Sequence, residues 1–173
     1  CSDKTGTLTE NVMSIVRGVF GGNHFDDGHY ETSVKESSRD IFQSPGNKYC
    51  SQELKNDVLA NIVLNSTAFE NKNFDPEMDD QDQNQDNNTT SHADRMDSIA
   101  RGRVEAYIGS KTETALLNMS RRALDVKFGS LQELRTNTKD HFNIEKVVQV
   151  VPFESSRKWA GVVVKLQGSD TYR

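Results

Sequence analysis

The pattern of apolar and polar positions predicts strands and helices in alternation in the first half of the chain. Residues 11–20 are rich in β-branched and apolar side chains, which favours a strand that ends at the glycine pair 21–22. Residues 23–50 are polar and mixed, so we expect a loop there. Apolar residues then recur at near-helical spacing over 51–70, and Ser51 can cap the start of the predicted helix.

The second half of the chain shows the same alternation and ends in two apolar runs. A short polar connection joins these two runs, which favours an antiparallel pair of strands. Trp159 opens the second run, and we expect it to pack against the core. The predicted elements are a strand at 104–109, a helix at 111–125, a loop at 129–142 with one helical turn, and strands at 144–151 and 159–166.

A strongly polar segment separates the two halves. Residues 79–88 contain only Asp, Asn and Gln and offer no apolar side chain to a core. Such a segment cannot offset its ordering entropy, so we expect a disordered insert at about 71–98. The carboxylates do not match a calcium-binding EF-hand loop, which needs a glycine at the turn and a closing glutamate.

Composition narrows the class of protein. The chain has 173 residues, 34% of them hydrophobic, which suits one ordinary domain or one domain with pieces of another. Its net charge of −5 disfavours a nucleic-acid partner, which would require a basic face. Cys1 and Cys50 match neither a disulfide framework nor a zinc site, as expected in a reducing compartment. The predicted fold class is α/β in the broad sense (α+β), with a mainly antiparallel sheet and flanking helices.

The most informative motif lies at residues 3–9, which read Asp-Lys-Thr-Gly-Thr-Leu-Thr and resemble the phosphorylation motif of P-type ATPases. The resemblance implies that Asp3 attacks the γ-phosphate of ATP, a step for which a carboxylate is a suitable covalent nucleophile. Lys4 and a bound Mg²⁺ can neutralise charge on the transferring group. Thr5 can offer its hydroxyl to the phosphate and its backbone carbonyl to the metal. The resemblance also implies that Asp3, through its side chain, and Thr5, through its backbone carbonyl, are the Mg²⁺ ligands.

A second motif surrounds Glu113, in the sequence Ser-Lys-Thr-Glu-Thr-Ala-Leu-Leu at 110–117. From the local pattern alone, Ser110 and Glu113 form a capping box at the start of a helix. The motif also resembles a nucleotide-binding segment of P-type calcium pumps, and this resemblance implies that Glu113 faces the amino group of adenine. A carboxylate is a suitable acceptor for that amine, and the two roles are compatible.

The third motif is the connection 152–158, which reads Pro-Phe-Glu-Ser-Ser-Arg-Lys. In the same family its phenylalanine stacks on adenine and a nearby lysine contacts the nucleotide, which implies these roles for Phe153 and Lys158. Some calcium pumps carry a phosphate-binding arginine where this chain has Ser155, and Arg157 could substitute for it. The alternative is a surface hairpin whose aromatic side chain is incidental.

Segment 109–117 and this hairpin are together similar to plasma-membrane-type calcium ATPases, and most similar to their fungal vacuolar members. The resemblance implies a fragment with the phosphorylation-site peptide at 1–14 and an incomplete nucleotide-binding domain at 15–173. It implies ATP and Mg²⁺ as cofactors and calcium as the transported ion, bound outside this segment. It also implies a place at the cytoplasmic face of a vacuolar, other internal or plasma membrane, to which the parent protein's helices attach it.

Two other classes of function remain open from the sequence. A soluble phosphohydrolase of the haloacid-dehalogenase type uses a related aspartate motif, but it usually places a second aspartate where this chain has Thr5. A binding or interaction module without catalysis would use the polar insert instead. We expect no ATPase turnover from the isolated chain, because later motifs of the pump family and all membrane helices are missing. Magnesium-dependent hydrolysis that Asp3→Asn abolishes would contradict this expectation.

Overall fold

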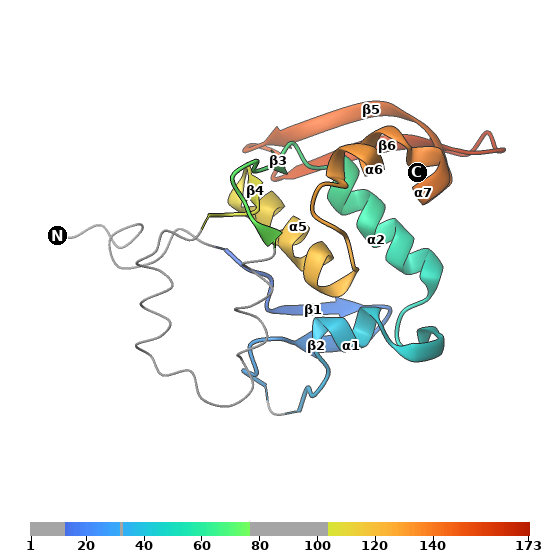
Figure 1. The fold of residues 1–173 in the computed structure, drawn as a ribbon. Helices are drawn as coiled ribbons and strands as arrows, with labels where there is room; N and C mark the ends of the chain where they lie inside the picture. The colour runs from blue at the N-terminus through green and yellow to red at the C-terminus, as the bar shows by residue number, and fades with distance from the viewer. Residues whose placement is uncertain (1–12, 32, 77–103) are drawn as a thin grey trace.

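The computed structural model describes residues 13–31, 33–76 and 104–173, which are the coloured parts of Figure 1. Asp3, Lys4 and Thr5 lie outside the described residues, as does the part of the expected insert from residue 77 onward. Within the described ranges no helix is both long enough and apolar enough to cross a membrane.

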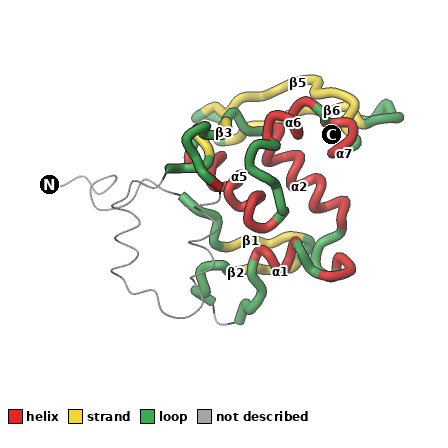
Figure 2. Tube along the Cα trace, viewed as in Figure 1, coloured by secondary structure: helices red, strands yellow, loops and turns green. Residues whose placement is uncertain are grey.

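Helices and antiparallel strand pairs form the described fold, which confirms the predicted mixture. Figure 1 shows α2 and α5 between the β5–β6 ribbon at the top and the β1–β2 pair at the bottom, and Figure 2 separates helix from strand by colour. The elements are β1 (Arg17–Phe20), β2 (Asn23–Asp26), α1 (Ser38–Phe42), the 3₁₀ helix η1 (Pro45–Asn47), α2 (Gln52–Leu64), β3 (Phe69–Glu70), β4 (Tyr107–Ile108), α5 (Lys111–Ala123), α6 (Leu131–Thr136), α7 (Thr138–Phe142), β5 (Ile144–Glu154) and β6 (Trp159–Leu166).

The described strands pair two by two, as β1–β2, β3–β4 and β5–β6, and each pair is antiparallel. The predicted pairing of the last two strands is confirmed, although β5 runs three residues further, to Glu154. Trp159 departs from its prediction, since it opens β6 with 52% of its surface exposed. It has no core to cover there, because most of β5 opposite is exposed as well.

One hydrophobic core lies beneath α5. The inward face of this helix supplies side chains that are fully or almost fully buried, and α2, α1 and β4 pack against the helix. Burying such side chains contributes about 1.5–3 kcal/mol each relative to leaving them exposed. The largest fully buried members of this core are Tyr107, Phe25, Phe42, Ile41, Leu117 and Met119.

The segment predicted as a loop at 23–50 contains β2 and α1. Helix α1 begins with a capping box in which Ser37 and Asp40 exchange hydrogen bonds. The bend after β2 is held by Asp26, whose carboxylate accepts the N–H groups of Gly28 and Glu31 at 3.0 and 2.7 Å. Elements of only four or five residues are too short to show hydrophobic periodicity, so the sequence pattern missed them.

The helix predicted at 51–70 is shorter in the structure. Ser51 caps α2 as expected, since its hydroxyl accepts the N–H of Leu54 at 3.2 Å. The helix ends at Leu64, and Phe69 pairs with Ile108 in β3–β4 instead of continuing it. The turn between α2 and β3, residues 65–68, positions the candidate site.

The first residues of the expected insert are packed against the domain. The Asn71 N–H donates to the carbonyl of Ala106 at 2.8 Å. The Phe74 ring lies 4.9 Å from that of Phe128, measured between ring centroids. Residues 71–76 of the segment predicted as a disordered insert therefore pack against the domain, and residues 77–98 of that segment lie outside the described residues.

Candidate functional site

The turn between α2 and β3, residues 65–68, connects two of the predicted binding segments. The Asn65 side-chain amide donates to the backbone carbonyl of Ala160 in β6 at 3.4 Å. Two residues later, the Thr67 hydroxyl donates to the Glu113 carboxylate at 3.1 Å. One short turn therefore contacts both the β5–β6 hairpin and the start of α5.

Glu113 lies in the first turn of α5, half-buried, with its carboxylate directed to Thr67. The capping box predicted for this helix is not formed, because the Ser110 side chain makes no capping hydrogen bond. That local interpretation was wrong. Glu113 is instead oriented by Thr67, which lies in the turn that follows α2.

Arg135 holds the turn in place from α6. Its guanidinium donates three hydrogen bonds, to the carbonyls of Val63 at 3.0 Å, Ala68 at 2.8 Å and Ser66 at 2.8 Å. Burial lowers the pKa of Arg135, while the charges of Glu113 and Glu70 act to raise it. Arginine stays protonated under such shifts, so a positive charge remains beside the turn. The sequence analysis missed this residue.

Gly109 lets the turn come close to the start of α5. A Cβ atom at this position would lie 2.6 Å from the Cβ of Ala68 and 2.8 Å from its Cα. Real Cβ atoms do not approach so closely, so any side chain here would push the turn away. The glycine that precedes the Ser-Lys-Thr-Glu motif is therefore required for the contact between Thr67 and Glu113.

The hairpin side of the candidate site is exposed. Phe153, near the end of β5, has 64% of its surface exposed. Lys158 adopts a left-handed conformation with φ of 60°, and its ammonium group donates to the Ser155 hydroxyl at 3.3 Å. The hairpin therefore presents an exposed ring, which stacking on a ligand requires, and it also carries an exposed lysine.

Arg157 is engaged within the hairpin. Its guanidinium forms an ion pair with Glu154 at 3.0 Å and donates to the Pro152 carbonyl at 3.1 Å. It also lies 5.2 Å from the centroid of the Trp159 ring. A role in phosphate binding, as predicted, would require Arg157 to exchange these partners for the phosphate.

The structure thus places four predicted site residues at one end of the molecule. Figure 1 shows the β5–β6 turn at the same end as β3, β4 and the start of α5. Glu113 and the hairpin are linked through Thr67 and Asn65 of the turn at 65–68. Asp3, Lys4 and Thr5 lie outside the described residues. Within the described part of the chain, no group of three or more His, Cys, Asp or Glu side chains could hold a metal ion.

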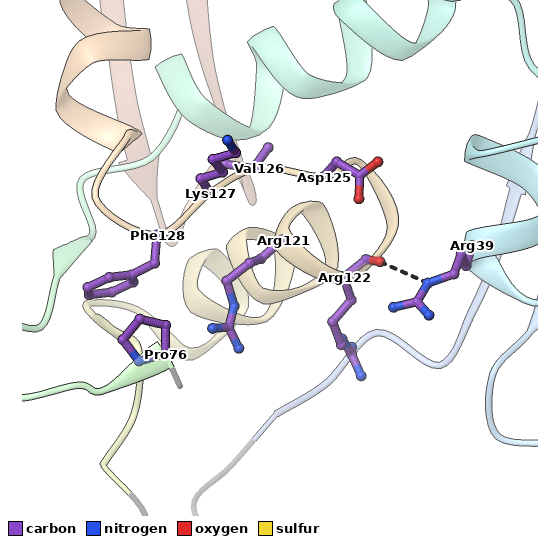
Figure 3. Close-up of a pocket in the computed structure, with 8 residues that line it drawn as sticks. All are labelled: Arg39, Pro76, Arg121, Arg122, Asp125, Val126, Lys127 and Phe128. Atoms are coloured by element: carbon purple, nitrogen blue, oxygen red, sulfur yellow. Dashed lines mark hydrogen bonds between the residues drawn. The ribbon is translucent and has the colours of Figure 1, made fainter. Parts of the chain in front are cut away.

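A separate pocket of about 540 Å³ lies at the other end of α5. It contains none of the predicted site residues, and its cationic side chains outnumber the single carboxylate of Asp125. Basic residues are common at the C-terminal end of a helix, where they complement the helix dipole. Figure 3 shows its lining residues, which are Arg39, Pro76, Arg121, Arg122, Asp125, Val126, Lys127 and Phe128.

Comparison with known proteins defines the class of the chain. A family model described as "P-type ATPase, cytoplasmic domain N" matches residues 53–173, and the chain belongs to this family. The turn at 65–68, Glu113 and the β5–β6 hairpin all fall inside the matched range.

Individual relatives are calcium-transporting ATPases by name. The chain is 45% identical to "Calcium-transporting ATPase 2" of Saccharomyces cerevisiae, over 95% of the chain and 16% of that protein. It is 30% identical to the protein of the same name from Cryptococcus neoformans, over 100% of the chain and 10% of that protein. It is 27% identical to human "Plasma membrane calcium-transporting ATPase 4", over 95% of the chain and 10% of that protein. The chain thus spans a small part of these relatives' length, and no solved structure matches it.

Proposed function

We propose that this chain is the ATP-binding part of a P-type calcium-transporting ATPase. The observation that carries the proposal is the turn at 65–68, which contacts both Glu113 and the β5–β6 hairpin in a chain that belongs to the cytoplasmic domain N family. Membership in this family favours a pump over a soluble phosphohydrolase. It also favours a nucleotide-binding role over an interaction module built on the polar insert.

The two sides of the site suit the two parts of a purine nucleotide. The exposed ring of Phe153 offers a face on which adenine can stack. The carboxylate of Glu113 can accept a hydrogen bond from the exocyclic amino group. Lys158 supplies a positive charge for the phosphates, and Arg157 can add a second one.

The phosphorylation step is assigned to the motif at residues 3–9, in the peptide that we place at 1–14, before a nucleotide-binding unit at 15–173. A carboxylate oxygen of Asp3 would attack the γ-phosphorus of ATP, the bond to the β–γ bridging oxygen would break, and ADP would leave. Lys4 and Thr5 would stabilise the charge of the transferring group. The Mg²⁺ that accompanies ATP neutralises phosphate charge in such reactions, with Asp3 and Thr5 as its proposed protein ligands.

Calcium is the proposed transported ion, since the matched relatives are named for calcium transport. The parent protein would then work at a membrane, with this chain on the cytoplasmic side as its family description says. The ion-binding residues would lie outside the chain.

A calorimetric titration of the 173-residue chain with ATP tests the proposal. We expect binding between sub-millimolar and millimolar strength that both Phe153→Ala and Glu113→Ala weaken. The matched controls are Val150→Ala, also exposed on β5, and Glu133→Ala, an exposed carboxylate on α6. Both controls should bind as the unchanged chain does. ATP binding that neither Phe153→Ala nor Glu113→Ala weakens would contradict the proposed site. A folded chain that binds no ATP would contradict the proposed function.

A further inference from the structure

The contact between Thr67 and Glu113 restricts what the carboxylate can bind. The Thr67 hydroxyl lies 3.1 and 3.4 Å from the two Glu113 oxygens and donates its proton to them. This bond fixes the orientation of the carboxylate, whose remaining lone pairs can only accept hydrogen bonds. A base placed opposite Glu113 must therefore present a donor.

The turn that carries Thr67 is itself fixed. Arg135 binds the carbonyls of Ser66 and Ala68, the residues on either side of Thr67, both at 2.8 Å. Hydrogen bonds from a charged donor are stronger than neutral ones, and two from one planar group define its orientation. The backbone at Thr67 therefore has little freedom to move its hydroxyl away from Glu113.

Purine bases differ at the position that such a carboxylate would meet. Adenine carries an amino group at its sixth ring position, which is a donor, whereas guanine carries a carbonyl oxygen there, which is an acceptor. Two acceptors facing each other leave both without a partner, which costs free energy in a partly buried site. Guanine has donors at N1 and at its 2-amino group, which lie at other ring positions. An acceptor fixed opposite the sixth position therefore discriminates between the two bases, whereas a freely rotating carboxylate could turn toward these donors.

We propose that Thr67 and Arg135 are positioning residues that hold Glu113 as a fixed acceptor and so set a preference for 6-aminopurine over 6-oxopurine nucleotides. The proposal rests on the proposed function, because it presumes that the base lies against Glu113. It assigns no chemical step to either residue. Thr67 and Arg135 contribute by orienting the Glu113 carboxylate, and the ratio of ATP to GTP affinity measures this contribution.

The experiment measures dissociation constants for ATP and GTP by calorimetry on the whole chain. Thr67→Val removes the hydroxyl and keeps the shape. We expect it to weaken ATP binding about three- to tenfold, the effect of one lost hydrogen bond, and to leave GTP binding within about twofold. Thr67→Ser restores the donor and should restore the preference. Thr136→Val is the control, because the Thr136 hydroxyl bonds to carbonyls within its own helix.

Arg135→Lys tests the second residue, since lysine keeps the charge but cannot reach several carbonyls with one planar group. We expect the ratio of ATP to GTP affinity to fall in this variant, with circular dichroism confirming that the chain is folded. Should Arg135→Lys unfold the chain, the pair Thr67→Val and Thr67→Ser still decides the proposal.

The outcomes separate this inference from the proposed function. Equal weakening of ATP and GTP by Thr67→Val would show a purely structural role and overturn the inference. Loss of ATP binding in Glu113→Ala with no effect of Thr67→Val would also overturn it, while leaving the proposed function intact. A folded, unchanged chain that binds neither nucleotide would overturn both.

Discussion

The two sides of the proposed nucleotide site are built in contrasting ways. Glu113 belongs to α5, whose next residues include Ala115 and Leu117, both with no exposed surface. Phe153 belongs to β5, on which Val150 is 58% exposed. One side is therefore part of the core, whereas the other is a ribbon that extends from it.

This contrast matches what each side is proposed to do. A hydrogen bond depends on direction, so the group that makes it gains from a rigid support such as α5. Stacking on a ring tolerates sliding, so an exposed hairpin can serve. Substitutions should therefore affect stability and binding together on the α5 side, and binding alone on the hairpin side.

The largest expected difference in stability is between a substitution in the core beneath α5 and a substitution on the hairpin. Leu117→Ala leaves a cavity in the core, and we expect it to lower the free energy of unfolding by about 3 kcal/mol. Val150→Ala truncates an exposed side chain and should cost about 0.5 kcal/mol or less. Urea denaturation followed by circular dichroism measures both. Equal losses would mean that the hairpin is as much a part of the core as α5.

The next largest difference in stability is between the removal of Arg135, which supports the Glu113 side of the site, and the removal of Arg157 on the hairpin. Arg135→Ala removes three hydrogen bonds to backbone carbonyls, and we expect a loss of about 2 kcal/mol. Arg157→Ala breaks an exposed ion pair on the hairpin and should cost about 0.5 kcal/mol or less. The same denaturation experiment applies. The comparison fails if Arg157→Ala destabilises the chain as much as Arg135→Ala does.

The smallest effect at neutral pH concerns Tyr107, a core residue of β4. Burial raises the pKa of Tyr107 to about 12. Its hydroxyl is buried and has no hydrogen-bond partner among the described residues, so Tyr107→Phe removes a desolvated group. We expect the free energy of unfolding at pH 7 to stay within about 0.5 kcal/mol of that of the unchanged chain or to rise.

The same residue predicts a pH dependence. Because the folded pKa is raised, the contribution of Tyr107 is present below about pH 10 and is lost as pH rises toward about 12. Denaturation at pH 9 and above, in the unchanged chain and in Tyr107→Phe, checks this sign. An equally steep alkaline loss of stability in both proteins would contradict the assignment.

Local motifs were sufficient to predict several parts of this site and fold. Ser51 at the start of α2 and the antiparallel β5–β6 pair follow from periodicity and short-range signals. Glu113 and Phe153 were named from motifs of a few residues each, and their roles in binding remain proposals.

The parts that the sequence did not reveal depend on contacts between distant residues. The local pattern predicts a capping box for Glu113 and the resemblance implies a contact with adenine, but neither indicates its partner Thr67, which lies 46 residues away. Arg135 binds carbonyls 67 to 72 residues away, and nothing in its own helical turn indicates this. Such contacts are fixed by tertiary packing, which neither periodicity nor capping patterns record.

The most direct test of the account is a map of the ATP site by backbone amide chemical shifts of the isotopically labelled chain. The account predicts that ATP shifts the amides of Thr67, Glu113, Phe153 and Lys158 and leaves those lining the pocket at the other end of α5 unchanged. Shifts that cluster instead at Arg39, Arg122 and Lys127 would place the nucleotide in that pocket and contradict the proposed site.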